Sequence, residues 1–204
     1  MSREREYRNM AFEVIRDGDE PSFLVEGYAA TFERYKLLTI DGVDYYEQIE
    51  PTAFDNTDMS DIVFRVDHEG PVYARSSAGT VEVVKDAHGL FQRTNLSKTQ
   101  RARDLYADIE VGNYPKMSFA FTVDEDHFDS ETNTRVIDRI AKIFDVSPVS
   151  FPANPTTELH ARSYFDGVIE AAKAAEAERL AAEEERRRDL ERREAIKNKI
   201  EEVL

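Results

Sequence analysis

The sequence changes character sharply near Ser163, and this change limits what the chain can fold into. From residue 168 to residue 204 there is no Gly and no Pro, and Ala, Glu and Arg dominate. These residues favour helix, and the acidic and basic residues recur at the spacing of helical neighbours. We therefore predict a folded domain over residues 1–163 and a charged helical tail over residues 164–204, with a long helix from about residue 165.

The apolar residues of the tail are too sparse for a core of its own, and they do not follow a regular heptad. They are Ile169, Leu180, Leu190, Ile196, Ile200, Val203 and Leu204. A helix of this kind gains most of its stability from a partner. Two interpretations stay open: a solvated helix without a partner, or an assembly helix that tethers the folded domain to another protein.

Charge and composition exclude several classes of function. The formal net charge is −15 and the chain has no cysteine. A strongly acidic chain does not suit nucleic acid or an anionic membrane surface, and without cysteine there is no disulfide framework and no thiolate site. The N-terminal stretch lacks the apolar run of a signal peptide, and no segment has the apolar length of a membrane span. We predict no nucleic-acid partner and no membrane association.

Short apolar and alternating segments predict that the first domain consists mostly of strands. "FLVEGYAATFERY" and "DIVFRVDH" are typical of strands, and "TVEVVKDAHGLFQRTNL" is typical of a hairpin. "SKTQRARDLYADIEVGNY" begins with capping residues and ends at Gly112, which indicates a helix. Two further strands flank the polar loop "DEDHFDSETNT". This pattern predicts an α+β fold built on a closed or strongly curved sheet.

Ser118 has two interpretations. It lies in "YPKMSFAF", where the large apolar residues alternate as on a strand with one buried face. Ser118 shares the opposite face with Ala120 and Thr122, and these small neighbours would leave room for a peptide. It is either a small residue on a crowded sheet or a nucleophile on a rigid strand.

A nucleophilic serine needs an imidazole base and a third group that orients the imidazole. His68 ends a predicted strand and is the best placed of the four histidines. Asp145 interrupts the apolar stretch "KIFDVS", where an acid is costly unless it is paired. Each also has a simpler interpretation: a hydrogen-bonded histidine at a strand end, and an outward-facing strand residue. The remaining histidines, in a turn, a loop and the edge of the tail, are His88, His127 and His160.

A metal site is the other chemistry that the sequence raises. His127 lies among four acidic residues, Asp124, Glu125, Asp126 and Asp129, which could hold a hard cation. The segment lacks the Gly and the regular ligand spacing of a calcium loop. A solvated acidic loop is the simpler interpretation, and we predict no metal and no cofactor.

Several motifs together resemble the prohead maturation proteases of tailed bacteriophages. "VDHEGPVYAR", "YPKMSFAF" and "FDVSPVSFPANP" occur in this order, and "VEGYAATFE", "EQIEPTAFDN" and "GTVEVVKDAHGLFQRTNL" also match the pattern of that family. The resemblance runs from about residue 10 to about residue 162. It implies a serine endopeptidase related in fold to the herpesvirus assembly proteases, a mostly antiparallel β-barrel ringed by a few helices.

The resemblance also implies a role for each candidate residue and for the tail. The histidine of the D-H motif falls on His68, the serine of the M-S motif on Ser118, and the acid of the third motif on Asp145. Such enzymes act in the host cytoplasm inside the immature capsid, where they cut scaffolding protein, or a scaffolding segment of the major capsid protein, and then themselves. The tail would carry the enzyme into the capsid or be removed by self-cleavage, and self-association is expected. The alternative is an assembly or scaffold module that keeps the fold without proteolysis.

Overall fold

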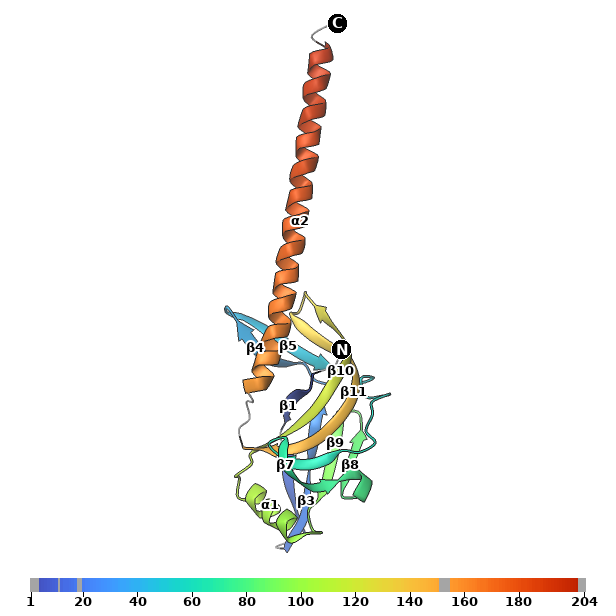
Figure 1. Ribbon diagram of the computed structural model, residues 1–204, viewed down its shortest axis with the longest axis vertical. Coiled ribbons are helices and arrows are strands. Elements are labelled where there is room, and N and C mark those ends of the chain that lie inside the picture. Colours follow the sequence, from blue (N-terminus) through green and yellow to red (C-terminus); the bar gives the residue numbers. More distant parts are fainter. Residues whose placement is uncertain (1–3, 11, 18–19, 151–154, 202–204) are drawn as a thin grey trace. The chain divides into compact units, whose positions relative to one another are not determined.

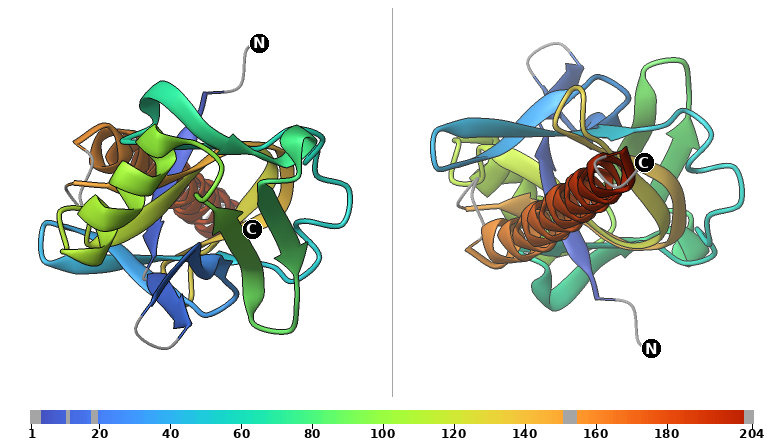
Figure 2. Two further views of the ribbon diagram at one scale, coloured as in Figure 1. Left: turned by 90° about the horizontal axis from the view of Figure 1, so that it is seen from below. Right: turned by 90° about the horizontal axis from the view of Figure 1, so that it is seen from above.

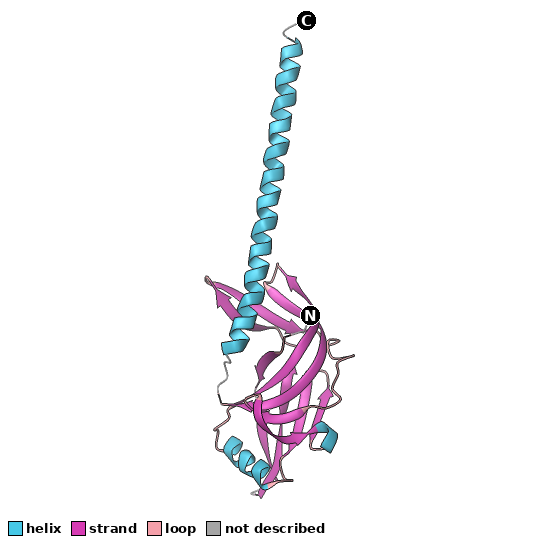
Figure 3. Ribbon diagram, viewed as in Figure 1, coloured by secondary structure: helices cyan, strands magenta, loops and turns pink. Residues whose placement is uncertain are grey.

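The computed structural model describes residues 4–10, 12–17, 20–150 and 155–201. The chain divides into two compact units, Met1–Arg162 and Ser163–Leu204. Strands dominate the first unit (Figure 3), and the described residues include two α-helices, α1 (Gln100–Glu110) and α2 (Pro155–Glu201) (Figure 1). The predicted α+β class with a long C-terminal helix is therefore confirmed.

A seven-stranded sheet carries Ser118 and Asp145 on its strands, and His68 in a turn between two of its strands. Its strands pair in the order β1-β10-β11-β5-β4, and the hairpin β6–β7 joins it through β11. The strand bounds are β1 Glu6–Met10, β4 Tyr35–Ile40, β5 Val43–Ile49, β6 Val63–Val66, β7 Glu69–Arg75, β10 Lys116–Asp129 and β11 Thr134–Val149.

A second sheet has four strands in the order β2-β3-β9-β8, all antiparallel. The hairpin predicted for "TVEVVKDAHGLFQRTNL" is confirmed as β8–β9. The strand bounds are β2 Phe12–Asp17, β3 Glu20–Thr31, β8 Val81–Lys85 and β9 Gly89–Asn95, and a short 3₁₀ helix, Ser76–Ala78, precedes β8.

The predicted barrel is not confirmed. Among the described strands, the ends of each sheet do not pair with each other, and no pairing joins the two sheets. The strands curve around the centre of the first unit without closing (Figure 2). The pairing is mostly antiparallel, as predicted; among the described strands, the parallel pairings are those of β11 with β5 and with β6. One edge of β11 pairs with β10, and the other edge pairs with β5 near its start and with β6 near its end. The sheet therefore branches at β11 instead of continuing to closure.

The hairpin β10–β11 is longer than predicted, because the polar stretch expected to be a loop is mostly strand. β10 continues to Asp129, and β11 begins at Thr134. Cross-strand pairs stabilise this part: Arg139 with Asp124, and His127 with Asp138 at 2.7 Å. Several shifts in register bend the hairpin.

The apolar core lies between the two sheets and α1. Along β10 the large residues Met117, Phe119 and Phe121 are fully buried, as the alternation predicted. α1 begins at the cap Thr99, which accepts a hydrogen bond from the backbone of Ala102, and it contributes its buried face to the same core. The core thus holds β10, the strand of Ser118, from its apolar side.

α2 begins at Pro155, about ten residues earlier than predicted. Its side chains from residue 170 to residue 192 are all exposed, including Leu180 and Leu190. Ion pairs at helical spacing run along it, such as Glu184 with Arg188 at 2.7 Å. Within the described part of the chain, no helix combines the length and apolar character that crossing a membrane requires.

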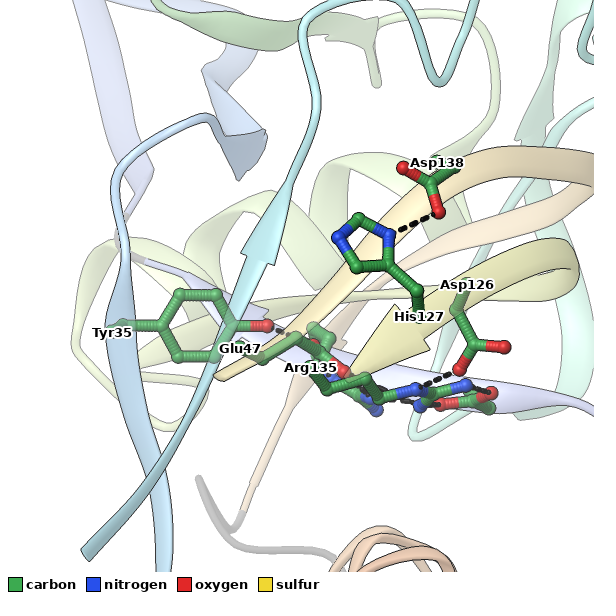
Figure 4. A network of polar contacts seen from close by, with 8 residues as sticks. Tyr35, Glu47, Asp126, His127, Arg135 and Asp138 are labelled. Atoms are coloured by element: carbon green, nitrogen blue, oxygen red, sulfur yellow. Dashed lines mark hydrogen bonds and ion pairs between the residues drawn. The ribbon is translucent and has the colours of Figure 1, made fainter. Parts of the chain in front are cut away.

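A cluster of buried charges ties β1 to β5 and β11. Figure 4 labels three of its members, Tyr35, Glu47 and Arg135. Arg8 donates two hydrogen bonds of 2.5 Å to the carboxylate of Glu47, which is fully buried and also accepts a hydrogen bond from the hydroxyl of Tyr35. Glu6 accepts hydrogen bonds of 2.6 and 2.9 Å from Arg135. We call Glu6, Arg8, Tyr35, Glu47 and Arg135 the β1 anchor. Such paired charges are costly to separate once buried.

The pKa values within the β1 anchor reflect a balance between burial and pairing with opposite charges. Burial opposes ionisation of Glu6, but the hydrogen bond from Arg135 and the charges of Arg8 and Arg135 outweigh it and lower the pKa of Glu6 to about 2. Because this pKa lies below the ordinary value of 4.5, ionised Glu6 stabilises the fold above about pH 4.5. That contribution is lost as the pH falls towards about 2. Burial and the neighbouring carboxylate of Glu47 raise the pKa of Tyr35.

We expect Glu47→Ala to lower the free energy of unfolding by about 3–5 kcal/mol, because it leaves the buried guanidinium of Arg8 without its main counter-charge. Urea denaturation followed by circular dichroism measures the change. Asp55→Ala is the matched control, since it removes one partner of the exposed Asp55–Lys85 pair and should cost far less. A loss in Glu47→Ala as small as that expected for an exposed pair would show that the β1 anchor does not stabilise the fold.

Candidate active site

The three residues singled out from the sequence come from three segments of the seven-stranded sheet. Ser118 lies on β10 and Asp145 on β11, and His68 lies in the turn between β6 and β7. Ser118 is opposite Ser147, and Ala120 is opposite Asp145. Because directly paired residues and next-but-one residues share a face, Ser118 and Asp145 lie on the same face of the sheet.

The imidazole of His68 bridges the other two side chains. Its Nδ1 lies 2.6 Å from Oδ1 of Asp145, and its Nε2 lies 2.7 Å from Oγ of Ser118. When Nδ1 carries the proton, it donates to Asp145, and Nε2 accepts the hydroxyl proton of Ser118. The parallel pairing of β11 with β6, with Asp145 beside Val63, brings the His68 turn over this face.

The turn that carries His68 has an unusual backbone. Asp67 and His68 have φ of +48° and +61°, the left-handed region, as in the two-residue turns that match the twist of hairpins. A side chain other than glycine is strained there. The carboxylate of Asp67 accepts hydrogen bonds of 2.8 Å from both the backbone N–H and the hydroxyl of Ser150, and its own N–H donates to the carbonyl of Pro148. These bonds attach the turn to the end of β11.

Asp145 has a second hydrogen-bond donor. The hydroxyl of Ser147 lies 2.6 Å from Oδ1 of Asp145, the same oxygen that faces His68. Both Asp145 and Ser147 are almost fully buried. A buried carboxylate needs such partners, and two donors on one oxygen hold the carboxylate in a single orientation.

The face that carries Ser118 is covered rather than open. Ser118 is 1% exposed, and Ala120 is fully buried. The expectation that small neighbours leave this face free for a peptide is therefore wrong. Nε2 of His68 lies 2.7 Å from Oγ of Ser118, and the ring of Tyr7 on β1 packs against that of His68, with 4.4 Å between ring centroids.

The acidic segment around His127 does not gather into a cluster of ligands. Asp124 pairs with Arg139, Asp126 with Arg135, and Asp138 with His127. The hydrogen bond from His127 to Asp138 raises the pKa of this exposed histidine. In the described parts of the chain, no group of three or more His, Cys, Asp or Glu side chains is placed to hold a metal ion.

Sequence reasoning missed the residues that support the three candidates. Ser147 falls two residues after Asp145 on the same strand, so alternation alone could have identified it. Asp67 precedes His68 in a two-residue turn, where Asp is favoured at positive φ. No local sequence pattern points to Tyr7, because only the pairing of β1 with β10 brings it beside His68.

The arrangement suits transfer of an acyl group through a serine. A hydroxyl hydrogen-bonded to a neutral imidazole can lose its proton as it attacks a carbonyl carbon. A carboxylate on the other ring nitrogen holds the tautomer and stabilises the imidazolium that forms.

Comparison with known proteins agrees with this chemistry. The family model described as caudovirus prohead serine protease matches residues 10–167, which include all three candidate residues. No significant match occurs among curated proteins or among solved structures. Since the match covers most of the chain, this protein belongs to the caudovirus prohead serine protease family.

Proposed function

We propose that this chain is the endopeptidase of phage capsid maturation, with Ser118 as nucleophile, His68 as general base and Asp145 as the residue that orients His68. The observation that carries the proposal is the position of the imidazole, with Asp145 Oδ1 at 2.6 Å and Ser118 Oγ at 2.7 Å. Family membership supplies the reaction class, hydrolysis of peptide bonds through a serine.

Each step follows from the contacts of these three residues. His68 Nε2 takes the proton of Ser118 as Oγ attacks the carbonyl carbon of the substrate, which gives a tetrahedral intermediate. His68 then returns the proton to the leaving amine, and the C–N bond breaks to give an acyl ester on Ser118. The same nitrogen next takes a proton from water as the water oxygen attacks the ester carbon. It then gives this proton to Oγ of Ser118 as the C–Oγ bond breaks, which releases the acid product and restores the serine. Throughout, Asp145 accepts the hydrogen bond from Nδ1–H of His68, and the hydroxyl of Ser147 holds the Asp145 carboxylate in place.

The proposed substrates are scaffolding protein, or a scaffolding segment of the major capsid protein, and the enzyme itself, inside the immature capsid of a phage-infected cell. Family membership supports this setting, since a prohead is the immature capsid. The exposed side chains of α2 from residue 170 to residue 192, with their unpartnered Leu180 and Leu190, support a tethering role for the tail.

We expect Ser118→Ala to lower kcat/KM by at least about 10,000-fold, because nothing replaces the attacking hydroxyl. Cleavage of purified scaffolding protein, followed by intact-mass analysis, measures both substrate cleavage and self-cleavage. Ser130→Ala, at an exposed serine beyond β10, is the control and should keep wild-type activity. Cleavage by Ser118→Ala at a comparable rate would exclude Ser118 as the nucleophile. If the wild-type enzyme cleaves neither the scaffolding protein nor itself, the result would favour the non-proteolytic assembly module instead.

His68→Ala should be as damaging as Ser118→Ala, and Asp145→Ala should cost less than either, because the acid orients the base without transferring the proton. The same cleavage assay gives the rates, and circular dichroism checks that each variant is folded. His88→Ala and His127→Ala are the matched controls, since both histidines lie on exposed hairpin positions away from Ser118. A loss in His88→Ala as large as that in His68→Ala would contradict the assignment of the base.

A variant truncated after Ile169 should cut a peptide substrate normally yet fail to enter the immature capsid. This end point keeps Phe165, which is buried, and removes the exposed part of α2. Both the truncated and the full-length chain should carry Ser118→Ala in the incorporation measurement, so that self-cleavage does not alter the count. Equal incorporation of the two chains would exclude a tethering role for the exposed helix.

A further inference from the structure

The imidazole of His68 has a third close neighbour in addition to Ser118 and Asp145. The ring of Tyr7, on β1, lies with its centroid 4.4 Å from that of His68, at an interplanar angle of 52°. The side chain of His68 is only 7% exposed. Tyr7 precedes residue 10, where the match to the family model begins, so family membership assigns it no role.

The backbone pairing of β1 puts Tyr7 on the face of the candidate site. Tyr7 pairs with Ala120 on β10, and the next pair but one is Asn9 with Ser118. Tyr7 therefore points to the same side of the sheet as Ser118. Because β11 occupies the other edge of β10, the strand of Ser118 is enclosed on both sides.

The β1 anchor holds β1 in place from the face opposite to Tyr7. Arg8 points away from Tyr7 and binds the buried carboxylate of Glu47, and its Nη1 donates a bond of 2.8 Å to the carbonyl oxygen of Tyr7 itself. Glu6, two residues before Arg8 and therefore on the same face, accepts a hydrogen bond of 2.8 Å from Arg8 and pairs with Arg135. A shift of β1 by one residue would separate these buried charges and turn Tyr7 to the other face. The position of the Tyr7 ring is therefore built into the fold.

We propose that Tyr7 is a positioning residue, whose ring holds the imidazole of His68 in the orientation that bridges Ser118 and Asp145. This inference rests on the proposed function for its consequence in catalysis. The two hydrogen bonds at Nδ1 and Nε2 act in the plane of the ring, at its edge, and do not support its faces. A rigid aromatic ring packed against one side of the imidazole supplies this support.

The same contact has an electrostatic effect during the reaction. His68 becomes positively charged when it takes the proton of Ser118. An aromatic ring within about 6 Å of a cation attracts it, and the attraction strengthens where water is excluded. Tyr7 thus stabilises the imidazolium as well as the orientation of the neutral ring.

Steady-state cleavage of a peptide substrate tests the kinetic part of the proposal. We expect Tyr7→Ala to lower kcat roughly 10- to 100-fold, the usual effect of a poorly held catalytic group, with little change in KM. Tyr7→Phe should keep most of the activity, because it retains the ring. Tyr28→Ala is the matched control, since Tyr28 packs on His88 in the other sheet with 6.1 Å between centroids. Tyr7→Leu, which keeps apolar volume without an aromatic ring, replaces Tyr7→Ala if that variant is unfolded and should lose kcat in the same way.

Proton NMR in the Ser118→Ala background tests the positioning without any need for activity. The Nδ1–H proton that His68 shares with Asp145 should give a low-field signal, which Tyr7→Ala weakens by faster exchange with water and Tyr7→Phe preserves. An unchanged signal together with full activity in Tyr7→Ala would overturn the role of Tyr7 while Ser118→Ala stays inactive. A faster Tyr7→Ala enzyme would also overturn it, because the ring would then obstruct the site. An active Ser118→Ala enzyme would instead overturn the proposed function.

Discussion

The antiparallel pairing of β10 with β11 is the interaction on which the candidate site depends. It places Ser118 opposite Ser147 and Ala120 opposite Asp145, so that the candidate nucleophile and the candidate acid, on the two strands of one hairpin, share one face. β11 also pairs in parallel with β6, which brings the His68 turn over that face. A slip of one residue in either pairing would turn one of these side chains to the opposite face. The core packed against Phe119 and Phe121 fixes the register, because a slip would also expose these rings.

Polar groups around the site are buried at a cost that specific partners offset. Asp145 has His68 and Ser147 as donors, and the positive φ values at Asp67 and His68 are held by the bonds from Asp67 to the end of β11. The β1 anchor extends the same principle away from the site, with Glu47 and Arg8 paired inside the fold. These arrangements add little net stability over an apolar core, but each removes an alternative position for a side chain or strand. We infer that these buried polar contacts matter chiefly because they determine where the His68 ring lies.

Strand alternation and local signals predicted much of the fold. The buried face of β10, the β8–β9 hairpin, α1 with its cap and the helical tail all follow from short stretches of sequence, where side-chain period and turn residues act locally. Three expectations about the fold differed. The acidic stretch at Asp124–Asp129 is strand, because charged partners on β11 stabilise it; α2 begins earlier than the composition break; and the barrel does not close among the described strands. In each case partners distant in sequence, or a boundary without a local signal, decided the outcome.

By itself, the sequence determined the residue types available for chemistry, the faces they occupy on their own strands, and the division into a strand-rich domain and a charged helix. It also carried the motifs that link the chain to its family. The tertiary structure decided which of these residues meet. His68 lies beside Asp145 and Ser118 because β6, β10 and β11 pair in one register, and Tyr7 reaches His68 because buried ion pairs hold β1 at the edge of β10. Strand pairing and burial of charge act between segments far apart in the chain, so no local pattern contains them.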